Sequence, residues 1–329
     1  MKDILNHLLE HKTLSKEEAK QSLTNIAKGN VNSAQVACFM TVFMMRSITV
    51  EELEGFRDAM LELCIPAGLE EYNPIDLCGT GGDGKDTFNI STIASFVVAG
   101  AGVKVAKHGN YGVSSACGSS NMMEYFGYKF TNDQSTLKSQ IEKAGICIMH
   151  APLFHPAMKH VAPVRKDLGV KTFFNMLGPM VNPSFPNNQL VGVFSLELAR
   201  LYGYLYQQTA KRFVILHSLD GYDEISLTGA FKFISNNKEQ VLNPHDIGFS
   251  KVLQSDLSGG ATIEDSAKIF MNVLNDCATK AQKEAVLANA GFAIYCAKEN
   301  LTLEEAMDQA KESLESKKAL KAFKTLMEL

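Results

Sequence analysis

A glycine-rich segment that carries two acidic residues is the first feature of this sequence that could do chemistry. Residues 76–92 read DLCGTGGDGKDTFNIST and contain a complete G-x-G-x-x-G pattern between Gly79 and Gly84. The same segment follows the Walker A pattern as far as Lys85, but Asp86 stands where that pattern needs Ser or Thr. Both patterns bind phosphate groups through backbone N–H groups, so the segment predicts a phosphate site.

Two common nucleotide sites do not fit this segment. A dinucleotide site needs an acidic residue about 20 positions after the glycines, at the end of the next strand, to bind the ribose hydroxyls. The next apolar strand, 103–107, ends instead in the cation Lys107. A Walker-type site needs a hydroxyl beside its lysine to hold Mg²⁺. Asp83 would also repel bare phosphate unless a metal ion or a ribose hydroxyl lay between them. The segment therefore favours a sugar phosphate with a cation nearby.

A second polar loop follows the next strand. Residues 107–115 (KHGNYGVSS) supply a cation, an amide side chain and a run of Gly and Ser. Before that strand, Asn89–Thr92 stand at the start of an apolar helix and offer hydroxyls and free backbone amides to an anion. Because ligands bind outside the carboxyl ends of the strands in parallel sheets, two such loops can hold two separate phosphate groups. The alternative is a helix cap followed by an ordinary turn between strand and helix.

An acidic pair, Asp223-Glu224, follows the apolar strand 213–217 by a short turn. It would lie at the same sheet edge as the glycine-rich segment. There it could hold Mg²⁺, an ion that takes few protein ligands and keeps several waters. Taken alone, such a pair in a loop is more often solvated surface charge.

Arg165 and His155 are the other candidate site residues. A guanidinium matches a carboxylate with two parallel hydrogen bonds, although Arg165 in the run RKD could equally be surface charge. His155 could line a substrate path, act as a weak base, or cap the helix that begins at Pro156. The spacing of His150, His155 and His160 matches no zinc signature. No nucleophile–base pair is evident, which is consistent with direct displacement.

Short apolar strands alternate with helices from residue 75 onward. The expected strands are 75–78, 103–107, 146–150, 190–194 and 213–217, and the expected helices are 92–101, 121–125, 133–144, 156–168 and 196–211. This alternation predicts an α/β fold with a mostly parallel sheet flanked by helices. A polar β excursion and long C-terminal helices complete the chain.

A smaller all-helical domain is expected at the N-terminus. Two capping boxes, SKEE and TVEE, mark helix starts there. Residues 34–45 are almost wholly apolar, so this helix must be buried in a bundle or against a second subunit. We expect the helical domain to span 1–70 and to be completed by a helical segment near 160–186, and the α/β domain to span 71–329.

The composition narrows the class of protein. At 46% hydrophobic and 21% charged residues it is typical of a soluble globular protein. A net charge of −4 gives no basic excess to attract nucleic acid or anionic membranes. No segment reads as a signal peptide or a membrane helix. Seven cysteines without a C-x-x-C pair are typical of reduced thiols. We therefore expect a cytoplasmic protein that binds neither nucleic acid nor membranes.

Several of these motifs, in this order and spacing, resemble the anthranilate phosphoribosyltransferase family of tryptophan biosynthesis. The resemblance rests on GTGGD (79–83), NIST (89–92), KHGN (107–110), HPAMKHVAPVRKDLGVKTFFNMLGP (155–179) and Asp223-Glu224, and it covers essentially the whole chain. The family belongs to the nucleoside-phosphorylase-like class of phosphoribosyltransferases. The resemblance implies a small helical domain, a larger α/β domain and a homodimer joined through the helical part.

The resemblance also implies two substrates, 5-phosphoribosyl 1-diphosphate (PRPP) and anthranilate, and magnesium as the cofactor. The residues that it implies for PRPP are Gly79, Gly82, Asp83, Thr87, Asn89, Ile90, Ser91, Thr92, Lys107, His108, Gly109, Asn110, Val113, Ser114, Ser115 and Ser119. Those implied for anthranilate are Gly79, Asn110, His155 and Arg165, and those for magnesium are Ser91, Asp223 and Glu224. No side chain is required as nucleophile or base, with His155 a weak candidate for the latter.

The sequence departs from the common family pattern in the second loop. Tyr111 and Ala116 stand where many members have cations, Cys117 follows, and Asn121 replaces a common acid. Two other enzymes therefore stay open: a pyrimidine nucleoside phosphorylase of the same fold class, and a paralogue that accepts a different acceptor. A catalytically idle member that binds nucleic acid is a third alternative, which the composition does not favour.

Overall fold

The computed structural model describes residues 1–112 and 117–329. The chain divides into two compact units, one formed by Met1–Pro66 with Ala151–Pro183 and the other by Ala67–His150 with Ser184–Leu329. The first break falls at Pro66 and not at residue 70, because proline ends the helical pattern there. The second helical segment runs over 151–183, where the sequence suggested 160–186.

The first unit is helical throughout. Its elements are α1 (Lys2–Leu9), α2 (Lys16–Ala27), α3 (Ser33–Met45), α4 (Val50–Leu63), α8 (Ala151–Phe154), η2 (Pro156–His160), α9 (Ala162–Leu168), α10 (Phe174–Leu177) and η3 (Gly178–Val181). Both predicted capping boxes are present, at Ser15 and Thr49. The rings of Phe39, Phe56 and Phe173 pack together in the core of this unit.

The prediction of a single helix over 156–168 is wrong. A 3-10 helix, η2, is followed by a separate α-helix, α9, with Pro163 in its first turn. Proline has no backbone N–H and clashes with the carbonyl four residues earlier in a helix interior. A new helix must therefore start at Ala162.

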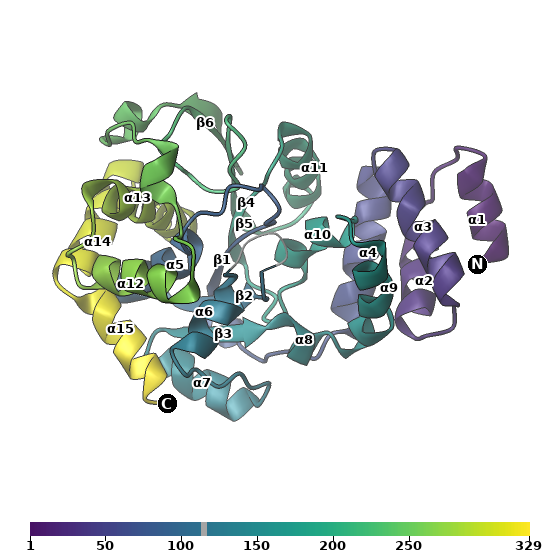
Figure 1. The fold of residues 1–329 in the computed structure, drawn as a ribbon, viewed down its shortest axis with the longest axis horizontal. Coiled ribbons are helices and arrows are strands. Elements are labelled where there is room, and N and C mark those ends of the chain that lie inside the picture. The colour runs from purple at the N-terminus through teal and green to yellow at the C-terminus, as the bar shows by residue number, and fades with distance from the viewer. Residues whose placement is uncertain (113–116) are drawn as a thin grey trace. The chain divides into compact units, whose positions relative to one another are not determined.

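The second unit contains a seven-stranded sheet. Figure 1 labels its strands β1 to β6. Its strands are β1 (Ile75–Gly79), β2 (Val105–Gly109), β3 (Ile146–His150), β4 (Asn188–Gly192), β5 (Arg212–Ser218), β6 (Phe231–Ser235) and β7 (Glu239–Leu242). The order in the sheet is β3-β2-β1-β4-β5-β6-β7. The first five strands pair in parallel, β6 pairs antiparallel with β5, and β7 pairs antiparallel with β6. The predicted mostly parallel sheet is confirmed.

Helices cover both faces of this sheet (Figure 1). On one face α5 (Ile90–Gly100) and α13 (Lys280–Ala297) pack over β1, β4 and β5. On the other face α11 (Leu196–Gln207) packs on β5, with Tyr206 against Phe213. The other elements of this unit are η1 (Glu70–Tyr72), α6 (Ser119–Tyr125), α7 (Gln134–Lys143), η4 (Pro244–Ile247), η5 (Gln254–Leu257), α12 (Ile263–Leu274), α14 (Leu303–Glu315) and α15 (Lys318–Met327). Over the described residues, no helix is long and apolar enough to cross a membrane.

The register of the strands decides where the polar loops lie. Gly79 at the end of β1 pairs with Gly192 at the end of β4, and Gly192 in turn pairs with Leu216 near the end of β5. The glycine-rich segment, the second polar loop and the acidic pair all follow strands that point the same way. They therefore emerge at one edge of the sheet.

Candidate active site

Asp223 lies between the ends of two strands. A Cβ atom built on Gly79 would overlap the carboxylate of Asp223, and one built on Gly192 would overlap its backbone carbonyl oxygen. The backbone N–H of Gly81 donates a hydrogen bond of 2.7 Å to Oδ2 of Asp223. The missing side chains at the two strand ends thus make room for a buried carboxylate beside the glycine-rich segment.

Glu224, the next residue along the chain, also contacts the glycine-rich segment and the start of α5. Its Oε1 accepts the backbone N–H of Ser91 at 3.0 Å, and its Oε2 lies 3.5 Å from the hydroxyl oxygen of Thr87. Ser91 is the second residue of α5, so the carboxylate lies at the positive end of that helix dipole. The backbone N–H of Ile225 bonds to the Asn289 amide oxygen, which fixes the acidic turn against α13.

The electrostatics of this acidic pair suit a divalent cation. Burial and the neighbouring Asp83 raise the pKa of Asp223 to about 7. Burial, Asp223 and Asp83 raise the pKa of Glu224 to about 8, although part of this side chain reaches solvent, which moderates the shift. The two groups titrate as a pair. A Mg²⁺ ion would remove this like-charge repulsion, and carboxylate oxygen is the ligand it prefers.

Lys107 is buried beneath the same loops. Its Nζ donates to the carbonyl oxygen of Leu77 in the neighbouring strand, and burial lowers its pKa. The carboxylates of Asp76 and Glu224 act in the opposite direction and favour the ammonium form. Lys107 thus lies at the base of the site, at the strand end where a dinucleotide site would need an acidic residue.

The glycine-rich segment is fixed on its outer side as well. The Lys85 ammonium lies 4.7 Å from the centre of the Tyr222 ring, within cation–π distance, and the Lys85 backbone N–H donates to Asp83 at 3.1 Å. Asp86 has a φ of 50°, in the left-handed region, where Asp is tolerated better than most side chains. Lys85 thus packs against the acidic turn.

The N-terminus of α5 lacks the side-chain cap that the sequence offered as an alternative. Asn89 stands at the N-cap position, but its side chain makes no capping bond and instead donates to the carbonyl oxygen of Cys117 at 3.0 Å. The first turn of α5 is therefore not capped by a side chain of its own, and the N–H of Ser91 bonds to Glu224. Ile90 and Thr92 are buried in the same turn.

The second polar loop begins at His108, whose backbone N–H donates to Asp76 at 3.1 Å. Gly109 ends β2, where a Cβ would overlap the Ser119 hydroxyl. Asn110 follows, and its carbonyl oxygen accepts from Ser119 at 3.4 Å. The remaining described residues that were expected to bind PRPP also lie at this edge of the sheet, namely Gly82, Asp83, Thr87 and Lys107. Three expected site residues, Val113, Ser114 and Ser115, and the neighbouring Ala116 lie outside the described residues.

His155 and Arg165 belong to the first unit. The His155 Nε2 donates to the carbonyl oxygen of Val181 at 2.9 Å, and burial lowers the pKa of this histidine to about 4. The imidazole is therefore neutral at pH 7 and a poor base. The suggested cap is wrong, because the side chain of His155 makes no capping bond at the start of η2.

Arg165 is half-buried and not merely surface charge. Its guanidinium lies 5.3 Å from the centre of the Phe174 ring, and its Nη2 is 3.5 Å from Oδ1 of Asn175. The same Asn175 oxygen accepts the backbone N–H of Thr172 at 3.1 Å. Arg165 makes no salt bridge with any carboxylate of the described residues. The Phe174 ring and the Asn175 amide thus fix the position of the guanidinium.

Two residues that the sequence analysis did not single out shape the site. Gly192 provides the space for Asp223, and the only sequence signal for it is a glycine at the end of a predicted strand. Asn289, in a helix far along the chain, fixes the acidic turn. Within the part of the chain that is described, no three His, Cys, Asp or Glu residues gather as a closed metal cluster. Any Mg²⁺ here would take further ligands from substrate and water.

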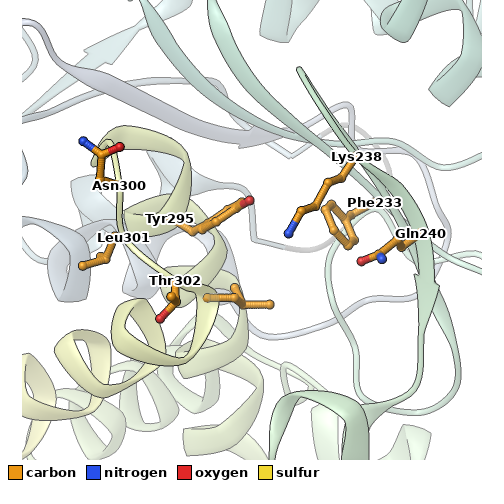
Figure 2. A pocket seen from close by; sticks show the side chains of 8 residues that line it. Phe233, Lys238, Gln240, Tyr295, Asn300, Leu301 and Thr302 are labelled. Carbon is orange, nitrogen blue, oxygen red and sulfur yellow. The ribbon is translucent and has the colours of Figure 1, made fainter.

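A pocket elsewhere in the second unit contains none of these residues. Figure 2 shows Lys238 and Gln240 of the β6–β7 hairpin facing Tyr295 and Thr302. It has a volume of about 270 Å³. Its β6 residue, Phe233, pairs with Leu216 of β5, and its other lining residues come from the β6–β7 hairpin and from residues 295–303.

A helical unit and a unit built on a mostly parallel sheet are the two kinds of domain that the glycosyl transferase family combines. The a/b domain profile of that family matches residues 71–320, and its helical bundle domain profile matches residues 2–64.

Individual relatives narrow the class further. Over 329 residues the chain is 63% identical to an anthranilate phosphoribosyltransferase of Christiangramia forsetii, covering 100% of this chain and 99% of the relative. The solved enzyme of that name from Thermus thermophilus has a TM-score of 0.91 and 31% identity, with 98% of each chain covered. The one from Saccharomyces cerevisiae, in complex with PRPP and Mg, has a TM-score of 0.87 and 26% identity, covering 98% of this chain and 96% of that one. The chain belongs to the anthranilate phosphoribosyltransferase family.

Proposed function

We propose that the chain transfers the phosphoribosyl group of PRPP to the amine of anthranilate and releases pyrophosphate, a step of tryptophan biosynthesis. The observation that carries this proposal is the meeting of three segments at one sheet edge. Gly81 and Ser91 each donate a backbone N–H to one carboxylate of the acidic pair. A phosphate-binding loop, a helix N-terminus and two carboxylates are the parts needed to hold a magnesium-bound diphosphate.

The chemistry is a displacement at C1 of the ribose. The C1–O bond to the diphosphate breaks, the C1–N bond to anthranilate forms, and the amine loses a proton. An aromatic amine is a weak nucleophile, so we expect a loose transition state with negative charge on the departing diphosphate. Backbone N–H groups of the glycine-rich segment and of α5, with Lys107, would stabilise that charge. We assign no side chain as base, since the pKa of His155 is about 4.

We assign the cofactor role to Mg²⁺, held by Asp223, Glu224 and the Ser91 hydroxyl. Bound there, it would neutralise the leaving diphosphate as a Lewis acid. The raised pKa values of the two carboxylates support a cation at this place. The relative from Saccharomyces cerevisiae, whose complex contains PRPP and Mg, gives independent support.

The test of the function is fluorescence detection of phosphoribosyl-anthranilate, with and without Mg²⁺. Consumption of anthranilate that requires both PRPP and Mg²⁺ is expected. Phosphorolysis of thymidine or uridine without consumption of anthranilate would identify a nucleoside phosphorylase instead. Turnover of PRPP only with another aromatic amine would identify a paralogue with a different acceptor.

Magnesium affinity is expected to rise with pH. The folded carboxylates have pKa values of about 7 and 8, against ordinary values of 3.8 and 4.5. Between about pH 4 and pH 8 the folded state therefore binds more protons than the unfolded chain, and the free energy of unfolding of the metal-free protein falls as pH rises. Because Mg²⁺ binds the deprotonated pair, calorimetry should give tighter binding at about pH 8.5 than at about pH 6.5. A pH-independent affinity would contradict the assignment.

We further propose a homodimer formed through the helical unit. On α3, Val36, Phe39, Met40 and Phe43 are buried, whereas Met44 and Met45 are 42% and 83% exposed on an otherwise apolar helix. Exposed apolar side chains on an otherwise apolar helix are expected at a subunit interface. Sedimentation velocity should show a dimer that Met44→Glu weakens. Leu253→Glu, at an apolar residue of the second unit that is 69% exposed, is the matched control and should stay dimeric.

A cytoplasmic location is part of the same proposal. All seven cysteines are free thiols in the structure, which fits a reducing compartment.

A further inference from the structure

The side chain of Asn121 joins two points of the second polar loop. Its Oδ1 accepts the backbone N–H of Gly112 at 2.9 Å and that of Gly118 at 3.0 Å. The two backbones touch, because a Cβ built on Gly118 would overlap the backbone nitrogen of Gly112. One amide oxygen thus holds the residues that flank 113–116 at a fixed separation.

The first turn of α6, which contains Asn121, also holds Asn110. The backbone N–H of Ser120 and the hydroxyl of Ser119 both donate to the Asn110 carbonyl oxygen, at 3.2 and 3.4 Å. Asn121 follows these two residues in α6. The position of Asn110 relative to α6 is therefore fixed by its own carbonyl oxygen and, two residues later, by the bond from Gly112 to Asn121.

The side chain of Asn110 is oriented by its neighbour. Its Oδ1 accepts the backbone N–H of Tyr111 at 2.8 Å. No hydrogen bond among the described residues uses its Nδ2, a group that can only donate. Such a donor suits the acceptor oxygens of a sugar or of a carboxylate.

Tyr111, whose side chain carries no charge, gives this loop a second attachment. Its ring meets the edge of His150 with 4.6 Å between ring centres, and its hydroxyl is 3.3 Å from Oε1 of Glu124. The Nδ1 of His150 is in turn hydrogen-bonded to the hydroxyl of Ser120 at 2.9 Å. The loop is thus fixed to α6 and β3 by hydrogen bonds and ring packing.

We propose that Asn121 is a positioning residue for phosphoribosyl transfer, acting by holding Gly112 and Gly118 so that Asn110 is placed for the substrates. The inference rests on the proposed function, because that assigns Asn110 to substrate binding. An amide oxygen accepts two N–H groups without adding negative charge beside an anionic diphosphate. A carboxylate at the same place would keep both bonds but add that charge.

The competing interpretation is purely structural. Gly118 is the N-cap residue of α6, so the bond from Gly118 to Asn121 is also half of a capping arrangement. A cap alone would contribute to thermal stability and leave substrate affinity unchanged. The two interpretations therefore differ in KM and in the dissociation constant of PRPP, and not in Tm.

The experiment compares Asn121→Leu with Asn121→Asp. Leu has nearly the same shape and removes both bonds, so it should raise the KM and the calorimetric Kd of Mg–PRPP roughly tenfold or more. Asp keeps the acceptor and should stay within about threefold of the wild type at high salt, with a weaker affinity at low salt where its charge is unscreened.

Asn236→Leu is the matched control. The Asn236 amide oxygen accepts the Phe213 N–H at 3.0 Å at the start of β5, at the opposite end of that strand from the site. Its loss should lower Tm and leave KM unchanged. A lower Tm with unchanged KM and Kd for Asn121→Leu would overturn the inference, as would an Asp variant as impaired as the Leu variant. The calorimetric Kd tests the inference even if the wild type binds PRPP but does not consume anthranilate, a result that would refute only the proposed function.

Discussion

Replacing Asp223 with Asn and Glu224 with Gln together is expected to lower kcat/KM by about 100- to 1000-fold. A metal ion that stabilises a leaving diphosphate contributes several kcal/mol to the transition state. The variant removes both carboxylates that we assign to that ion. Its amide oxygens can still accept the N–H groups of Gly81 and Ser91, so the turn should keep its place. Steady-state kinetics across a Mg²⁺ titration is the measurement.

The fold of this variant provides a second readout. The neutral amides no longer repel one another, so its Tm at about pH 8 should equal or exceed that of the metal-free wild type. The matched control is Asp220→Asn on the same turn, where the exposed carboxylate accepts a hydrogen bond from Thr228 and contacts neither Gly81 nor Ser91. Asp220→Asn should retain near wild-type kinetics. Full Mg²⁺-dependent turnover by the double variant would contradict the proposal that the pair binds the metal.

Arg165→Ala is expected to raise the KM for anthranilate about 10- to 100-fold while changing the KM for PRPP much less. A charge-assisted contact contributes roughly 1.5–3 kcal/mol, which corresponds to about a 10- to 100-fold change in affinity, and the planar guanidinium matches the geometry of a carboxylate. The guanidinium lies over Phe174 beside Asn175, so it is already oriented before a ligand arrives. Initial-rate kinetics with each substrate varied in turn separates the two KM values.

Arg165→Lys provides a stricter version of the same test. Lysine keeps the charge but loses the planar pair of donors, so most of the increase in KM for anthranilate should remain. Lys166→Ala, at the exposed next position of α9, is the control and should have little effect on either KM. Equal rises in both KM values for Arg165→Ala would argue against a carboxylate ligand.

The strand-end placement of the site followed from the sequence because its causes are local. Alternation of apolar strands with helices predicted the parallel sheet, and the polar residues after 75–78, 103–107 and 213–217 then had to share one edge. Predicting that the glycine-rich segment lies beside Asp223-Glu224 needed only the rule that parallel strands end at the same edge of a sheet. The space that Gly192 leaves for Asp223 did not follow, because it depends on the close approach of two segments.

The features missed by sequence analysis depend on tertiary contacts. Asn121 looks like an ordinary substitution until Gly112 and Gly118 are seen to share its amide oxygen. His155 reads as a helix cap beside Pro156, yet its Nε2 donates a hydrogen bond to the backbone carbonyl oxygen of Val181 instead. Burial also sets the pKa values of the acidic pair, and no sequence pattern gives the depth at which a side chain lies.

The central claim is that the glycine-rich segment, the start of α5 and the acidic turn surround one magnesium-bound diphosphate. A crystal structure of the protein grown with PRPP and Mn²⁺ in place of Mg²⁺ would test it through the anomalous signal of the metal. We expect a manganese peak bound by Asp223 or Glu224 and by diphosphate oxygens, with those oxygens accepting from the backbone of the glycine-rich segment. A metal bound elsewhere, or a diphosphate away from Gly82 and Asn89, would contradict it.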